Sequence, residues 1–246
     1  MDTNCPEATH VAVRDGRVLA VGGRDCADGW GGEIQHDTRF ADSVMMPGLV
    51  EAHAHVAAGG IWRFVYVGHY ARTDPDGRVW EGVTSNEAIV ARLQKALSAL
   101  PAGKALVGWG FDPNMIGGSR LDRLHLDRVS TEVPVVVMHS NMHLLTANSK
   151  ALDAGGIDAG SNIEGIVRDG SGQPNGELQE FAAMAPVTEI ANVSIKALSD
   201  GDAVRAYGQV ARLAGVTTAA DLLSDLYDDE VAMLRGITGD PAYPIR

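Results

Sequence analysis

The sequence predicts an α/β protein with a parallel sheet, preceded by a β-rich N-terminal part. From residue 48 onward, short apolar strand-like segments alternate with helical ones, the order typical of βα units. Before that point, apolar and polar residues alternate around Asp15-Gly16. Asp-Gly in this setting predicts a hairpin, because both turn positions favour a positive φ. We therefore expect a boundary at Pro47, with a β-rich part over 1–47 and an α/β body over 48–246.

The individual elements follow from local patterns. A hairpin is predicted over 11–21 and one or two further short strands over 33–46. Thr84 and Glu87 have the spacing of a capping box and predict the start of an amphipathic helix. Helices are expected over 84–100, 146–156, 202–215 and 228–236, and body strands over 49–53, 105–110, 133–139 and 216–221. Four such βα units would make half of an eight-stranded (β/α) TIM-type barrel, so the predicted body is a partial barrel.

Composition excludes several classes of protein. The chain carries 32 acidic and 20 basic residues, a net charge of −12, which argues against nucleic-acid binding and gives no support for an anionic membrane partner. Two cysteines, Cys5 and Cys26, cannot make a disulfide framework. The N-terminus lacks the pattern of a signal peptide, and no apolar run approaches a membrane span. We expect a cytoplasmic protein.

"PGLVEAHAH" (47–55) places His53 and His55 at the end of a predicted strand. Residues at i and i+2 on a strand point to the same face, so the two imidazoles could reach one metal ion. They could equally be two polar residues that share an exposed face. Their position at the carboxyl end of the strand favours a metal site, since active sites of β/α barrels form there. Neutral imidazole suits zinc and its neighbours.

Several segments together resemble one protein family. They are "MMPGLVEAHAHV", "GWGFD" (108–112), residues 121–157, "EGIVRDGSGQPNGELQE" (164–180) and "GVTTAADL" (215–222). Their order resembles the metal-dependent amidohydrolase superfamily, in its amidohydrolase family 3 (YtcJ-like) branch, from about residue 10 onward. The resemblance implies a small β-sandwich, built from both ends of the chain, around a metal-bearing barrel. It also implies hydrolysis of carbon–nitrogen bonds other than peptide bonds by a metal-activated water.

The resemblance also suggests metal ligands in this chain. His53 and His55 match the paired ligands of the first barrel strand, and the expected ion is a divalent metal, zinc above all. Glu180, in "GELQE", matches a glutamate of the branch that could join the metal. The alternative is a solvated carboxylate at a helix start. Glu177, close by, is expected at the surface.

Three further residues are candidates for substrate binding. His143 matches the histidine of an Asp-Gly-His pattern, although Asn141-Met142 replaces Asp-Gly here. Asp112 follows the "GWGF" strand and could line the site, or it could cap a turn or face solvent. Asn148 could bind substrate or cap a helix.

Other residues at strand ends carry weaker signals. Asp221 ends a predicted strand and could support the site or only face solvent. His139 ends an apolar strand, where a core and a functional role are both open. Trp62 and Trp109 are expected to pack in the core rather than to hold substrate.

The superfamily completes its metal site with histidines and an aspartate from later strands, but no histidine follows His143 here. The catalytic residues therefore stay unassigned. We expect an N-terminal half with little activity alone, which would need a missing C-terminal half or self-associate through open strand edges. The alternative is a non-catalytic α/β scaffold or interaction fragment that keeps the motif. The substrate would be a small molecule, chosen by loops that the sequence does not identify.

Overall fold

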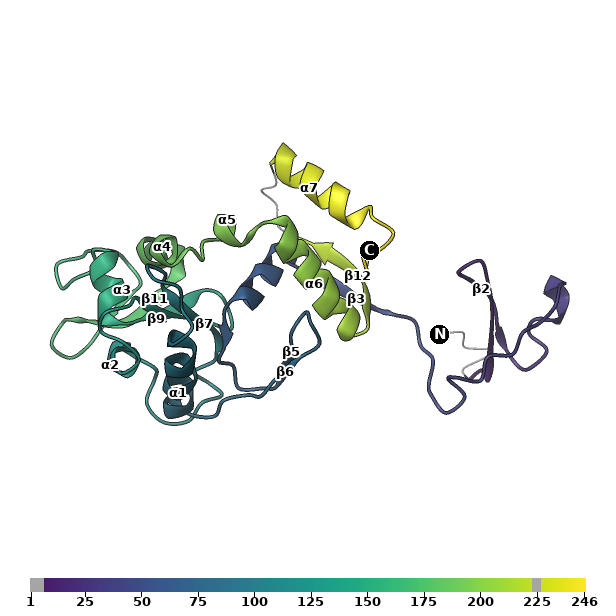
Figure 1. Ribbon diagram of the computed structural model, residues 1–246, viewed down its shortest axis with the longest axis horizontal. Coiled ribbons are helices and arrows are strands. Elements are labelled where there is room, and N and C mark those ends of the chain that lie inside the picture. The colour runs from purple at the N-terminus through teal and green to yellow at the C-terminus, as the bar shows by residue number, and fades with distance from the viewer. Residues whose placement is uncertain (1–6, 223–226) are drawn as a thin grey trace. The chain divides into compact units, whose positions relative to one another are not determined.

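A computed structural model of the chain describes residues 7–222 and 227–246 (Figure 1). The chain divides into two compact units, Met1–Pro47 and Gly48–Arg246. In the first unit, β1 (His10–Arg14) and β2 (Arg17–Gly22) pair antiparallel around Asp15 and Gly16. Both turn residues have a positive φ, 51° and 70°, which confirms the predicted hairpin. Cys5 lies outside the described residues.

The segment 33–46 was predicted to hold one or two short strands, and this prediction is wrong. After a 3₁₀ helix, η1 (Asp28–Trp30), these residues form no strand and stay exposed. Val44, for example, is 93% exposed. A strand needs a hydrogen-bonded partner, and the described part of this unit offers none to the segment.

The second unit, residues 48–246, contains a mixed sheet of six strands in the order β10-β11-β9-β8-β7-β4. The strands β4, β7 and β8 run parallel, whereas β8, β9, β11 and β10 pair antiparallel in that order. The strands are β4 (Val65–Tyr66), β7 (Leu106–Phe111), β8 (Val135–His139), β9 (Leu144–Ala147), β10 (Ile166–Arg168) and β11 (Pro174–Gln179). A separate short hairpin pairs β5 (Arg72–Thr73) with β6 (Val79–Trp80).

Helices accompany this sheet at several points along the chain. The helix α1 (Asn86–Leu97) buries Ile89 and Leu93 in the same apolar cluster as residues of β7 and β8. Its cap is Ser85, whose hydroxyl accepts from the Ala88 N–H at 3.2 Å, rather than the predicted Thr84. The others are α2 (Arg123–Asp127), α3 (Ser149–Ala154), α4 (Glu180–Ala191) and α5 (Ile195–Leu198).

A second, smaller sheet pairs β3 (Leu49–Ala54) with β12 (Val216–Asp221) in parallel. The 3₁₀ helix η2 (Val56–Arg63) leaves β3 and packs against α6 (Gly201–Leu213), which precedes β12. This approach is close because Gly59 has no side chain: a Cβ there would lie 2.0 Å from the Ala203 carbonyl oxygen. After α7 (Asp228–Thr238), Arg246 exchanges backbone hydrogen bonds with Thr217 and Ala219 of β12.

The four predicted barrel strands therefore do not form one parallel sheet, and the expectation of four consecutive βα units is wrong. The strands near 49–53 and 216–221 pair with each other, while those near 105–110 and 133–139 belong to the mixed sheet. The chain turns back after β8 into β9, where a helix start was predicted at residue 146. The fold is a mixed α/β one. In the described residues, no helix is long and apolar enough to span a membrane.

Candidate functional site

His53 and His55 lie at the carboxyl end of β3, close to each other. Their ring centroids are 5.2 Å apart, with the rings nearly perpendicular at 87°. The intervening Ala54 is buried, so the alternation of the strand turns both imidazoles away from the packed side. Half of the His55 side chain is exposed. The pair is thus open to solvent and to any ion that two imidazoles can bind.

Asp221, the last residue of β12, approaches this pair from the neighbouring strand. Parallel pairing sets Asp221 opposite Ala54. One carboxylate oxygen, Oδ2, accepts a hydrogen bond of 3.0 Å from the Val56 N–H. The other, Oδ1, lies 3.7 Å from Nδ1 of His55. The structure therefore places Asp221 beside the histidine pair, as one reading of the sequence had it.

The chemistry of this pair suits a metal ion, but the number of donors is small. Imidazole nitrogens are common zinc ligands, and a zinc site usually has about four ligands, water included. Among the described residues, no group of three or more His, Cys, Asp or Glu side chains is arranged to hold a metal ion. The described chain thus supplies two imidazoles, and any closed site needs further ligands.

Glu180 does not join His53 and His55, contrary to the resemblance. Its carboxylate Oε2 lies 3.1 Å from Nδ1 of His143 instead, and both side chains are largely exposed. The reason is topological: Glu180 begins α4 directly after β11 of the mixed sheet, whereas the two histidines belong to the β3·β12 pair. Its position matches the alternative of a solvated carboxylate at a helix start.

Backbone strain marks the surroundings of the His143–Glu180 pair. Met142 and Glu180 have φ values of 62° and 64°, in the left-handed region that residues other than glycine rarely adopt. Two other non-glycine residues with positive φ have ordinary explanations, since Asp15 sits in a hairpin turn and Asn192 ends α4. Strained backbone often concentrates at functional sites. This pair is therefore a second candidate region, on the mixed sheet.

Asp112 and Asn148, the other proposed substrate residues, make bonds within the fold. Asp112 accepts from the backbone and side chain of Asn114, which closes a local turn. Asn148 is fully buried and caps α3 through the Ala151 N–H. Its amide group also donates to the carbonyl oxygens of Ser130 and Val133. Asn148 thus presents no surface to a small molecule, and its capping alternative is the one observed.

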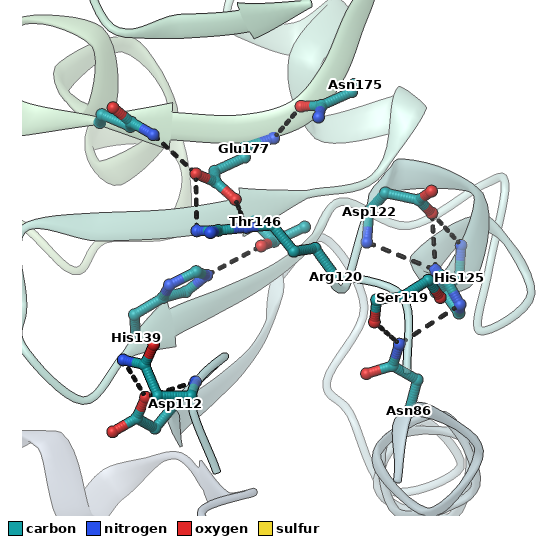
Figure 2. Close-up of polar contacts among 12 residues, drawn as sticks. Asn86, Asp112, Ser119, Arg120, Asp122, His125, His139, Thr146, Asn175 and Glu177 are labelled. Carbon is teal, nitrogen blue, oxygen red and sulfur yellow. Dashed lines mark hydrogen bonds and ion pairs between the residues drawn. The ribbon is translucent and has the colours of Figure 1, made fainter. Parts of the chain in front are cut away.

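Glu177 is buried, not at the surface as the sequence suggested. Figure 2 shows its carboxylate facing the Arg120 side chain. Its two carboxylate oxygens accept from Arg120 at 2.8 and 3.0 Å, and Gln179 donates a third bond at 2.7 Å. Glu177 lies on β11 opposite Thr146 of β9. Its partner Arg120 is 57 positions away along the chain, so no local pattern could have revealed the pair.

His139 is part of the same buried polar region (Figure 2). Its Nε2 lies 2.9 Å from the Thr146 hydroxyl, while Nδ1 has no hydrogen-bond partner among the described residues. Burial lowers the pKa of His139 to about 4, the nearby Glu177 opposing this effect. The histidine is therefore neutral and lies in the core, which is one of the two roles that the sequence left open for it.

The two tryptophans also pack inside the fold, as expected. The ring of Trp62 meets that of Trp109 edge to face at 4.8 Å, and Tyr66 contacts both. Trp109 is buried on β7, and Trp62 and Tyr66 belong to the same apolar cluster. They stabilise the mixed sheet.

Comparison with known proteins assigns the chain to a family. The model of the amidohydrolase family matches residues 41–246, which include His53, His55 and Asp221. The chain belongs to the amidohydrolase family. The chain is 31% identical over 188 residues to the exoenzymes regulatory protein AepA of Pectobacterium carotovorum subsp. carotovorum. It is 28% identical over 187 residues to the N-substituted formamide deformylase of Arthrobacter pascens.

These relatives are much longer than the matched part. The matches cover 72% and 73% of this chain, but only 38% and 32% of the two relatives. Among solved structures, an uncharacterized metal-dependent hydrolase from Pyrococcus horikoshii OT3 matches with a TM-score of 0.52 at 16% identity. That match covers 96% of this chain and 43% of the other. At such low identity it shows a shared fold.

Proposed function

We propose that this chain is part of a metal-dependent hydrolase that cleaves carbon–nitrogen bonds, other than peptide bonds, in a small molecule. The observation that carries the proposal is the His53–His55 pair, with ring centroids 5.2 Å apart at the carboxyl end of β3. Membership of the amidohydrolase family supports the hydrolytic chemistry. The likeness to a formamide deformylase supports a carbon–nitrogen bond as the target.

In this proposal His53 and His55 bind a divalent ion, with zinc the ion that imidazole ligands favour. When bound, such an ion makes water a nucleophile near neutral pH and polarises a carbonyl group. His143, with Glu180 3.1 Å from its Nδ1, and Asp112 are the residues proposed to contact substrate. Both His143 and Glu180 have exposed side chains, so a small molecule could reach them.

Metal analysis of the purified 246-residue protein tests the proposal. The samples are the wild type, His53→Ala, His55→Ala, and His36→Ala as a control at an exposed histidine of the N-terminal unit. We expect zinc after dialysis in the wild type and the control, and its loss in both β3 variants. Equal metal content in all four proteins would contradict the assignment of His53 and His55.

A second function is favoured by one observation: among the described residues, two imidazoles and no third metal-binding group gather at this site. Two donors leave a zinc ion under-coordinated, so we propose that hydrolysis by this chain alone is weak. The alternative is a non-catalytic scaffold or interaction role, and one relative carries the name of a regulatory protein. An assay of N-formyl and N-acyl amines with added zinc decides between hydrolysis by this chain and a non-catalytic role. Robust zinc-dependent turnover by the isolated chain would contradict the weak-activity proposal.

A further inference from the structure

We propose that Asp221 is a positioning residue for His55. Its carboxylate accepts a hydrogen bond from the Nδ1–H of the imidazole, and this tautomer leaves the lone pair on Nε2 available for a metal ion. The inference rests on the proposed function, because it assigns Asp221 a role toward one of the two proposed metal ligands. The observation behind it is the position of Asp221, whose carboxylate bonds to the backbone of Val56 and faces the ring of His55.

The position of the carboxylate is fixed by contacts on both sides. Oδ2 accepts from the Val56 N–H at 3.0 Å, immediately after His55 in the chain. The backbone ties the two strand ends together as well, because the Leu222 N–H donates to the Ala54 carbonyl at 3.2 Å. Asp221 is only 18% exposed, whereas His55 is 49% exposed. The carboxylate is therefore the better-fixed member of the pair.

Oδ1 lies 3.7 Å from Nδ1 of His55, an ion-pair distance somewhat longer than a hydrogen bond. A displacement of the exposed imidazole by less than about 1 Å would close it to a normal hydrogen bond. Hydrogen bonds at such sites commonly tighten when the ligand binds. The geometry thus brings the Nδ1 edge of the ring, rather than its Nε2 edge, toward the carboxylate.

The surroundings of Asp221 are partly apolar and carry negative charge. A small cavity beside it is lined by Val56, Val204 and Glu230, among others. The same negative charge acts on Tyr207 of α6. The pKa of its phenol is raised mainly by burial and to a smaller extent by the charges of Glu51 and Asp221. Negative charge in a partly buried setting stabilises a proton on the facing nitrogen. Removing a carboxylate that fixes a metal-binding histidine in this way typically lowers metal affinity by about 10–100-fold.

The first test uses the metal-free protein, so its outcome does not depend on metal binding. Long-range ¹H–¹⁵N spectra at about pH 8, above the ordinary imidazole pKa, report which ring nitrogen of His55 carries the proton. We expect the Nδ1–H form in the wild type and a shift toward Nε2–H in Asp221→Ala. Asp221→Asn keeps an acceptor for Val56 and serves as the variant that preserves the fold; we expect a mixture. An unchanged tautomer in both variants would overturn the inference.

The second test asks whether Asp221 acts through His55. Zinc affinity is measured by competition with a chromophoric chelator for the wild type, Asp221→Ala, His55→Ala and the double variant. We expect a loss of about 10–100-fold for Asp221→Ala, and no further loss when it is added to His55→Ala. Asp202→Asn, an exposed carboxylate on α6, is the control and should change nothing.

The outcomes separate this inference from the proposed function. A further loss of zinc affinity in the double variant would show that Asp221 acts independently of His55, and the inference would fall. A wild type that binds no zinc would contradict the proposed function alone, because the tautomer of His55 still decides the role of Asp221.

Discussion

The two sheets of residues 48–246 differ in what they bury. In the mixed sheet, β7 and β8 are almost entirely buried, and even polar residues there, such as Glu177, have protein partners. In the β3·β12 pair, five of the six residues of β3 are exposed, and the strand ends in two accessible histidines. The comparison teaches that the well-buried core and the proposed metal-binding histidines lie in different sheets. Changes in one should affect folding, and changes in the other should affect metal binding.

The largest effect should come from the core of the mixed sheet. Leu178 of β11 is fully buried and lies opposite Leu145 of β9. We expect Leu178→Ala to lower the free energy of unfolding by about 2–5 kcal/mol through lost burial and a cavity. The matched change Val50→Ala on β3, where the side chain is 68% exposed, should cost less than about 0.5 kcal/mol. Urea denaturation measures both, and equal losses would remove the contrast between the sheets.

Acid should weaken the mixed sheet through His139. Its pKa is lowered to about 4 by burial, while an unfolded histidine titrates near 6.5. The folded state thus binds this proton more weakly. The contribution of neutral His139 to the free energy of unfolding is therefore complete above pH 6.5. It is lost as the pH falls from that value toward about 4. The expected loss is about 3 kcal/mol.

The variant His139→Gln isolates this contribution from the other acid-titrating groups. Glutamine does not titrate and can still bond to the Thr146 hydroxyl, the partner of the wild-type ring. Unfolding free energies measured from pH 7 to pH 4 should therefore fall less steeply in the variant. Parallel pH profiles for the two proteins would show that His139 is not the group responsible.

Removing the partner of Glu177 should cost somewhat less. Arg120→Ala leaves a buried carboxylate without its cation, and breaking a buried pair typically costs about 3–5 kcal/mol. Because the Arg120 side chain is 57% exposed, we expect about 2–3 kcal/mol, measured by thermal unfolding. The double variant Arg120→Ala/Glu177→Gln should recover part of this loss, since an uncharged amide is easier to bury. No recovery would mean that Arg120 stabilises by packing rather than by charge.

The smallest effect concerns the strained backbone at Glu180. Its φ of 64° suits glycine, so Glu180→Gly should be about 1 kcal/mol more stable than Glu180→Ala. The His143–Glu180 contact adds little to stability because both side chains are exposed. Calorimetry of the two variants measures the difference. If alanine were equally stable, the left-handed conformation would not be strained, and its value as a sign of function would disappear.

Much of the local structure could be predicted from the sequence. Asp15-Gly16 specified a hairpin, the apolar spacing of Ile89 and Leu93 specified a helix, and "PGLVEAHAH" specified a strand that ends at the histidine pair. These patterns act over a few residues, where backbone preference and side-chain alternation decide the outcome. The one-residue error at Ser85 is of the same local kind, since two neighbouring hydroxyl residues compete to cap one helix.

The sequence by itself thus determined the elements that have a strong local pattern: the hairpin at Asp15-Gly16, the helix around Ile89 and Leu93, and the strand that leads to the histidine pair. Only the tertiary structure decided how the strands pair: β3 lies beside β12, more than 150 residues away, and the reversal into β9 makes the other sheet mixed. The same pairing brings Asp221 to His55, buries Glu177 against Arg120, and separates Glu180 from the histidines. The physical reason is that hydrogen bonds between strands and burial of charge depend on distant partners, which local patterns do not encode.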